Sequence, residues 1–453
     1  MANQNVLDLR DVAAKSRELE GQIVTVEGWV RNHRKQKSIG FIEFFDGTVL
    51  TPMQIVYDDK VKDFAAVQAI RNGAAVRATG KLVPGRNGAL EMQAEDIPEA
   101  TARRTIRSAK RHTLEFCATS LSASAHALFQ AVFRVRSIAA QAVHNYFQSR
   151  GYVYVHTPLI TANDAEGAGN TFTVTNQEMG KPYKAENDFF GKATALAVTG
   201  QLEAETYALA YKRVYTFGPT FRAENSNTKT HAAEFWMIEP EICFCDLNGL
   251  MDIEEDFLKS VVQEVLDKAV PELEFLQGYA KSNLIEKLQT LTQSRRARDT
   301  CGGHRHPAAR DASVRASGGA GRGSVQGARK YLTEEHFKSP VFVYDWPKEI
   351  KAFYMYQNDD GKTVRGVDLL VPGSGELMGG SERETRLDVL TGRMDELHIS
   401  KEQMDWYVNL RRFGGCTHSG FGMGFERLIM YLTDIENIRD VIPYPRTPGN
   451  CEF

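Results

Sequence analysis

The sequence predicts an α+β protein with a strand-rich N-terminal part, a long amphipathic helix and a second, larger strand-rich part. Residues 20–98 contain five short alternating segments separated by Gly, Pro and Asn turns. Residues 131–150 carry apolar side chains at helical spacing. Strand-like runs follow at 214–241 and return after Val341, which predicts a large, mainly antiparallel sheet flanked by helices.

Composition limits the possible classes of protein. The 453 residues are enough for two or three domains, and the hydrophobic content of 42% and charged content of 25% are ordinary for a globular protein. With a net charge of −3, any nucleic-acid contact must come from local basic patches. No apolar run reaches the length of about 18 residues that a membrane span needs. The six scattered cysteines predict a reduced, cytoplasmic protein.

The N-terminal strands predict a small five-stranded barrel, and the OB-fold is the barrel of this size that binds oligonucleotides. Basic residues gather between the first two strands, with aromatic residues close by. Such a group grips single-stranded RNA and stacks its bases, although a solvated hairpin tip over core aromatics has the same composition. The candidate RNA-binding residues are Arg31, Arg34, Lys35 and Phe41.

The chain divides at a basic linker. We expect one domain over residues 1–98, the linker over 99–128 and a second domain over 129–453. The second domain opens with the helix at 131–150, which stops at Gly151 before a short strand and Thr157-Pro158. A core helix and a dimer-interface helix are equally apolar, so periodicity does not separate them.

A strand–loop–strand at residues 214–241 has a face suited to a nucleotide. Arg222 and Glu224 are two residues apart, so both point to one face of an extended strand. An arginine can fork onto a phosphate, and Phe235 on the second strand can stack on a base. A hairpin with a charged face is the plainer alternative, and this segment alone favours it.

The segment GFGMGFERL at residues 420–428 adds a second arginine. Its glycines let the backbone approach a ligand, and Arg427 stands near the start of an apolar helix. Two arginines in such settings are difficult to explain as solvated surface.

Together the two segments resemble motifs 2 and 3 of the class II aminoacyl-tRNA synthetases, and within that class the bacterial-type asparaginyl-tRNA synthetases. Each motif is weak alone, but the pair in this order is specific. The resemblance covers residues 5–116, 129–293 and 330–453. The segments that carry it are FGPTFRAENSNT, AEFWMIEPE, HSGFGMGFERL and IRDVIPYPRTP.

The resemblance implies a two-step reaction that uses ATP. A carboxylate attacks the α-phosphorus to give an aminoacyl-adenylate and pyrophosphate, and the terminal ribose of tRNA then takes the acyl group. By resemblance, Arg222 binds the α-phosphate and the attacking carboxylate, and Arg427 binds the γ-phosphate. Phe235 stacks on adenine, while Glu224 and His231 contact ATP from the loop.

The resemblance also implies a Mg²⁺ site. Asp368 and Glu376, in VDLLVPGSGELMGG, match the metal-binding carboxylates, and Mg²⁺ prefers oxygen ligands. Without the resemblance, both would be interpreted as loop acids in water. Glu382 stands where glutamine is common in the family, which adds negative charge to a region expected to bind phosphates.

Amino-acid selection must separate asparagine from aspartate, which are nearly isosteric, so it requires buried hydrogen bonds. By resemblance, Arg412 holds the side-chain carbonyl. A carboxylate opposite it accepts from the amide and repels aspartate, and Glu239 or Glu241 suits that role. Glu166 and Gln201 match the groups that hold the α-ammonium and the substrate backbone.

The expected partners are asparagine, tRNA(Asn) bound through its anticodon by the barrel, and a second copy of the chain joined through residues 131–158. Three alternatives remain open at this point. They are an aspartyl-tRNA synthetase, a relative of ammonia-dependent asparagine synthetase, and an inactive paralogue.

Two segments depart from the family. Residues 117–128 lack its Leu-Arg-x-Arg element, and residues 295–329 lack its Gly-x-Asp-Leu and the glutamate before Tyr331-Leu332. Residues 295–329 have almost no large apolar side chains, so we expect them to be disordered and to lie outside the catalytic sheet. They end a mostly helical region, 251–329, that we expect to be a peripheral insertion.

Overall fold

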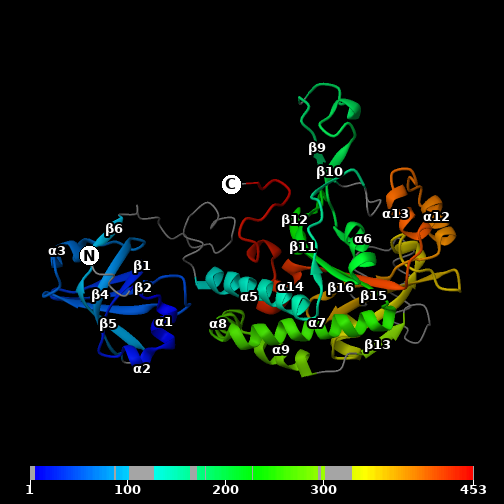
Figure 1. Cartoon of the computed structure of the whole chain (residues 1–453). Helices are drawn as coiled ribbons and strands as arrows, with labels where there is room; N and C mark the ends of the chain where they lie inside the picture. Colours follow the sequence, from blue (N-terminus) through cyan, green and yellow to red (C-terminus); the bar gives the residue numbers. More distant parts are fainter. Residues whose placement is uncertain are drawn as a thin grey trace. The chain divides into compact units, whose positions relative to one another are not determined.

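The computed structural model divides into two compact units, Met1–Ala131 and Val132–Phe453 (Figure 1). None of its described helices is both long enough and apolar enough to cross a membrane. The described residues are 6–85, 88–101, 127–163, 171–178, 180–226, 228–293, 297–300 and 329–451.

The first unit is a closed five-stranded barrel, as predicted. Strand β1 pairs with both β2 and β4, and the ring continues through β3 and β5, with only β3 and β5 parallel. The short strand β6 adds to β4 outside the ring. The strands are β1 (Ile23–Lys35), β2 (Ile39–Phe45), β3 (Met53–Asp58), β4 (Ala75–Pro84), β5 (Leu90–Asp96) and β6 (Glu99–Thr101), and the helices are α1 (Leu9–Ala14), α2 (Ser16–Leu19) and α3 (Phe64–Ala69).

The barrel closes around an apolar interior, which the alternation of apolar and polar residues along its strands predicts. On β4, Val76, Ala78 and Leu82 are buried while Arg77 is exposed. This period of two is what a strand with one face toward a core requires.

The second unit is built on an eight-stranded sheet in the order β13-β14-β15-β16-β17-β12-β11-β7. Every neighbouring pair is antiparallel except β7–β11 and β13–β14, which confirms the predicted fold class. The strands are β7 (Val153–Tyr154), β11 (Arg213–Phe221), β12 (Glu234–Cys243), β13 (Ala297–Thr300), β14 (Val341–Pro347), β15 (Thr363–Val371), β16 (Gly375–Glu382) and β17 (His418–Gly424).

Long helices α5 and α7 lie against this sheet (Figure 1). Phe257 of α7 packs on Tyr146 and Phe147 of α5 and on Phe421 of β17. Part of the region 251–329 is therefore core, because α7 buries an apolar stripe under the sheet. The helices are α5 (Ala127–Ser149), α7 (Leu247–Lys268), α8 (Val270–Ala280) and α9 (Leu284–Gln293).

The expectation that residues 295–329 lie outside the sheet is wrong for its first part. Ala297–Thr300 forms β13, which pairs in parallel with β14 at the edge of the sheet. A terminal strand is held by backbone hydrogen bonds, so the lack of large apolar residues does not prevent its pairing. Residues 301–328, like 117–126, lie outside the described part of the chain.

The remaining elements surround the sheet. A hairpin rises from it, and β10 pairs with both β8 and β9 (Figure 1). These elements are β8 (Ile160–Thr161), β9 (Thr173–Val174), β10 (Thr194–Leu196), α6 (Gln201–Tyr211), α12 (Leu387–Glu396), α13 (Asp405–Arg412), α14 (Phe425–Thr433) and the short helical turns Ala185–Asn187, Tyr331–His336, Lys348–Ile350 and Ile438–Asp440.

Candidate functional site

One end of the sheet collects the residues expected to bind a nucleotide. Arg222 directly follows β11, Phe235 is the second residue of the antiparallel β12, and Arg427 closely follows β17. Because β11, β12 and β17 are neighbours with alternating directions, the last residues of β11 and β17 lie at the same end of the sheet as the first residues of β12. The sheet order therefore brings these three positions together.

Arg222 and Phe235 are in direct contact. The Arg222 guanidinium lies 5.5 Å from the Phe235 ring centroid. Its backbone N–H donates to the Ala233 carbonyl at 2.9 Å, which fixes the strand end. The loop between them holds Glu224, which is partly buried, and His231, whose Nδ1 contacts the Thr228 hydroxyl. A cation beside an aromatic face offers one phosphate contact and one stacking surface.

Asp368 and Glu376 approach each other at this same end of the sheet. Asp368 on β15 pairs with Gly379, and a Cβ on Gly379 would lie 3.6 Å from Asp368 Oδ1 and 3.4 Å from Glu376 Oε1. Glu376 lies at the start of β16, and Arg427 Nη1 donates to its carbonyl oxygen at 3.5 Å. The predicted carboxylate pair is therefore adjacent to Arg427, which lies in α14 directly after the neighbouring strand β17.

The two carboxylates are already neutralised by the chain. Arg329 Nη2 lies 2.7 Å from Glu376 Oε2, and Lys351 Nζ lies 2.7 Å from Asp368 Oδ1. Burial raises the pKa of Asp368, and Lys351 opposes that rise. Burial acts to raise the pKa of Glu376 as well, but the charges of Arg329, Lys351 and Arg427 prevail and lower it.

This arrangement does not fit a bound Mg²⁺ ion. Within the described residues, no group of three or more His, Cys, Asp or Glu side chains is placed to hold a metal. Asp368 and Glu376 supply two carboxylates, and cations of the chain face both of them. A divalent ion would have to enter against those charges.

A fully buried pair of opposite charges lies deeper in the sheet. Glu241 of β12 and Arg383, directly after β16, are both essentially inaccessible. The guanidinium forks onto the carboxylate, with Nε to Oε2 at 3.1 Å and Nη2 to Oε1 closer still. Glu241 lies against Gly420 of β17, at a place where a Cβ would collide with its carboxylate. The sheet is thus shaped around this pair.

Electrostatics keep Arg383 charged. Burial acts to lower the pKa of Arg383, but the Glu241 carboxylate outweighs it and raises that pKa. A buried, forked ion pair offers a donor and an acceptor in fixed positions. The sequence reasoning missed Arg383 because nothing in GGSERET distinguishes it from other charged residues near a strand end.

Glu239 has a different set of contacts. Its Oε2 accepts from the Gly200 backbone N–H at 3.0 Å, and its Oε1 accepts from the Thr199 hydroxyl. It therefore ties β12 to the start of α6, whose first residue is Gln201. The Gln201 amide nitrogen is buried and has no hydrogen-bond partner among the described residues, so it is placed to donate to a ligand.

Arg412 lies away from both glutamates. It is about half exposed at the end of α13 and pairs with Asp405 at 2.6 Å. The preceding residue, Arg411, is the buried one, and its Nη2 lies 2.7 Å from Glu205 Oε1. The structure therefore does not bring Arg412 to the pair that includes Glu241.

Glu205 of α6 is the centre of a second buried cluster. It accepts from the Tyr407 hydroxyl at 2.7 Å, and His418 Nε2 lies 2.7 Å from its Oε1. Burial acts to lower the pKa of His418, but the Glu205 carboxylate raises it above 6.5. This cluster, defined by Glu205, Tyr407, Arg411 and His418, lies within electrostatic range of Arg383 and Glu241.

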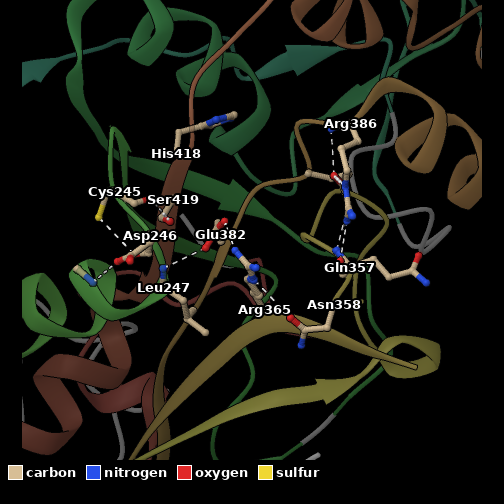
Figure 2. Close-up of polar contacts among 12 residues, drawn as sticks. Cys245, Asp246, Leu247, Gln357, Asn358, Arg365, Glu382, Arg386, His418 and Ser419 are labelled. Atoms are coloured by element: carbon tan, nitrogen blue, oxygen red, sulfur yellow. Dashed lines mark hydrogen bonds and ion pairs between the residues drawn. The ribbon is translucent and has the colours of Figure 1, made fainter. Parts of the chain in front are cut away.

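Glu382 is held in the interior by its own partners (Figure 2). Its Oε1 accepts from Arg365 at 2.6 Å, and its Oε2 accepts from the Leu247 backbone N–H at 3.2 Å. Leu247 is the first residue of α7, so the carboxylate lies at a helix N-terminus, where negative charge is favourable. The extra charge is thus compensated locally.

The barrel residues expected to bind RNA share one hairpin of the first unit. Arg34 pairs with Phe41 across β1 and β2, and its guanidinium lies 5.7 Å from that ring. Lys35 is exposed, and Arg31 lies 5.0 Å from the Phe45 ring. Glu166 lies outside the described residues.

Comparison with known families matches each unit. The profile described as "tRNA synthetases class II (D, K and N)" matches residues 118–448. The profile described as "OB-fold nucleic acid binding domain" matches residues 24–99.

Individual relatives match nearly the whole chain. The protein named asparagine–tRNA ligase of Acholeplasma laidlawii is 48% identical over 99% of this chain and 100% of its own length. The protein of the same name from Bacillus anthracis is 48% identical over 96% of each chain. The crystal structure of asparaginyl-tRNA synthetase from Pyrococcus horikoshii complexed with asparaginyl-adenylate is 26% identical, with a TM-score of 0.83 and full coverage of both chains.

Proposed function

The chain belongs to the class II tRNA synthetase family that carries the designation D, K and N, and we propose that it joins asparagine to tRNA(Asn) through an asparaginyl-adenylate. ATP supplies the adenylate, and AMP and pyrophosphate are released. The observation that carries the choice of asparagine is the buried, forked pair of Arg383 and Glu241.

Nucleotide binding is assigned to the end of the sheet. Arg222 faces the α-phosphate and the attacking carboxylate, and Phe235 stacks on adenine, consistent with their mutual contact. Arg427 faces the γ-phosphate from the start of α14, while Glu224 and His231 complete the loop side. Such chemistry needs charge neutralisation and alignment of the attacking oxygen more than proton transfer.

Asparagine is read by the pair of opposite charges. The side-chain carbonyl accepts from Arg383, and the amide NH₂ donates to Glu241. Aspartate in the same place would set its own carboxylate against Glu241 at a buried site, which is unfavourable. Arg383 thus takes the role that the sequence comparison gave to Arg412. Gln201 donates to the substrate backbone, and Glu166 is proposed as the partner of the α-ammonium.

The remaining parts of the proposal concern partners. The barrel binds the anticodon through Arg31, Arg34, Lys35 and Phe41, and two copies of the chain associate through residues 131–158. Mg²⁺ remains the expected counter-ion of the ATP phosphates, and we do not assign it to Asp368 and Glu376. The four cysteines that the structure describes are free thiols, which supports a cytoplasmic location.

The decisive experiment is amino-acid-dependent ATP–pyrophosphate exchange with the full chain. Asparagine is expected to support exchange, and aspartate is expected to support far less. Charging of tRNA(Asn) with labelled asparagine tests the second step. Equal exchange with aspartate would reject the assignment of specificity, and the absence of exchange with either amino acid would reject the activity.

A further inference from the structure

One guanidinium of the chain lies between the carboxylates that sequence comparison assigns to a metal. Arg329 Nη2 is 2.7 Å from Glu376 Oε2 and 3.5 Å from Asp368 Oδ2. Asp368 is 1% exposed, and the Arg329 side chain is 27% exposed. Arg329 thus pairs closely with the partly buried Glu376 and more loosely with the buried Asp368.

Two more cations surround the same pair. Lys351 Nζ is 2.7 Å from Asp368 Oδ1 and lies 4.7 Å from the Trp346 ring centroid. Arg427 donates to the Glu376 carbonyl from the first turn of α14. Two negative charges therefore face three positive ones, and the cluster is already cationic before any ion is added.

The position of Arg329 in the chain has a sequence counterpart. It stands two residues before Tyr331, in the stretch where the family resemblance leads one to expect a glutamate. A glutamate there would add a third oxygen ligand near Asp368 and Glu376, whereas Arg329 adds a positive charge. With arginine at this position, the guanidinium of Arg329 pairs with the two carboxylates in place of a metal ion.

We infer that Arg329 occupies the cation position between Asp368 and Glu376, so that this chain holds a guanidinium where a divalent ion would otherwise bind. Arg329, Lys351 and Arg427 together then supply the positive charge at this edge of the sheet. The statement that this positive charge acts on the phosphates of ATP rests on the proposed function. The exclusion of the ion follows from the contacts alone.

The test is a titration of the ATP-free full chain with Mn²⁺, which reports divalent binding through loss of the free-ion electron paramagnetic resonance signal. The unsubstituted chain is expected to show no stoichiometric site in the submillimolar range. Arg329→Glu converts the cluster into three carboxylates. This variant is expected to bind one Mn²⁺ per chain, with an affinity at least about tenfold higher than that of the unsubstituted chain. Arg329→Ala is expected to bind with intermediate affinity.

Two controls locate the effect. Lys330→Glu makes the same charge change at the next residue, whose exposed side chain pairs with Glu334, and is expected to gain no site. Adding Asp368→Asn and Glu376→Gln to Arg329→Glu is expected to abolish the gained site. Thermal unfolding confirms that each variant is folded.

Two results would overturn the inference. One is a stoichiometric Mn²⁺ site in the unsubstituted chain that disappears with Asp368→Asn, which would show that Arg329 moves aside for the ion. The other is a folded Arg329→Glu chain that gains no site. Because no ATP or amino acid is present, neither result depends on the exchange assay that tests the proposed function.

Discussion

At the scale of single residues, the proposed recognition of asparagine predicts that changing Glu241 alters specificity. Glu241→Gln would remove the repulsion against aspartate and leave the buried Arg383 without its charged partner. We expect the preference for asparagine to fall by about 1.5–3 kcal/mol, the range for a hydrogen bond to a charged group. The measurement is the ratio of exchange efficiencies, kcat/KM, for asparagine and aspartate.

Glu239→Gln is the matched comparison, because Glu239 is similarly buried on the same strand but bonds Thr199 and Gly200. It is expected to change both exchange efficiencies alike and to leave their ratio intact. A collapse of the ratio in Glu239→Gln, with none in Glu241→Gln, would mean that the wrong glutamate has been assigned.

Arg222→Ala and Arg427→Ala should each cost transition-state stabilisation in adenylate formation. Loss of a charge-assisted contact to phosphate is expected to lower kcat/KM for ATP, and the decrease should correspond to a loss of at least about 1.5–3 kcal/mol of transition-state stabilisation. Lys401→Ala, which removes an exposed pair with Asp395, serves as the charge control and should behave normally. Near-normal exchange in either arginine variant would contradict the nucleotide site.

His418 should make stability depend on pH. The folded-state pKa of His418 is raised above the ordinary value of 6.5 by the Glu205 carboxylate. The stabilisation that protonated His418 gains from Glu205 is therefore fully present below pH 6.5, and it is lost as the pH rises through the folded-state pKa. The free energy of unfolding should therefore decrease as the pH rises from the ordinary histidine pKa to the higher folded-state pKa, by at most about 1.4 kcal/mol per pH unit. Urea denaturation at several pH values measures this slope.

His418→Gln is expected to flatten that slope. The other members of the cluster do not titrate in this range, since Arg411 stays charged and the pKa of Tyr407 is raised well above 10. A slope that persists unchanged in His418→Gln would show that another group is responsible.

The contrast between Arg411 and Arg412 marks a limit of sequence reasoning. Consecutive residues of a helix differ by about 100° around its axis, so one arginine faces Glu205 and the next faces solvent. Motif comparison finds such a pair but does not give its rotation. The sequence could predict the positions of Arg222, Phe235 and Arg427, because strand ends and glycines fix where these residues lie.

At the scale of elements, the start of α7 depends on Glu382. The carboxylate joins Arg365 of β15 to the Leu247 backbone N–H, so it connects three elements. Glu382→Ala is expected to lower the free energy of unfolding by about 1–3 kcal/mol, because the buried Leu247 N–H and the partly exposed Arg365 guanidinium lose their acceptor. Glu382→Gln keeps an acceptor and should cost less.

A double-mutant cycle with Arg365→Ala checks this coupling. The two single losses should sum to more than the loss in the double variant, because each single change leaves a partner unpaired. Strictly additive losses in urea denaturation would show that Glu382 and Arg365 act independently.

Elements were easier to predict from sequence than their neighbours in space. The barrel strands followed from alternation, since one face of each is buried. The role of α7 was misjudged, because a helix that covers a sheet has the same apolar stripe as a peripheral one. Strand β13 was missed because edge pairing uses backbone groups that composition does not report.

At the scale of the whole molecule, the two units should separate RNA recognition from adenylate formation. Arg34→Ala removes a cation that lies over the Phe41 ring in the barrel. It is expected to raise the KM for tRNA in charging severalfold, because a positive charge available to the RNA backbone is lost, while ATP–pyrophosphate exchange stays unchanged.

Lys81→Ala, an exposed basic change on β4, is the control and should leave charging intact. A loss of exchange activity in Arg34→Ala would contradict the division of labour between the units.

The pairing of Arg383 with Glu241 has a consequence for inhibitor chemistry. In the free protein each satisfies the other, so an incoming group must replace both contacts at once. A carboxamide does so, whereas a ketone leaves Glu241 without a donor and a methyl group leaves both buried charges without a partner. Adenylate mimics directed at this proposed site should therefore retain the primary amide, and analogues with an apolar group in its place should lose most of their affinity.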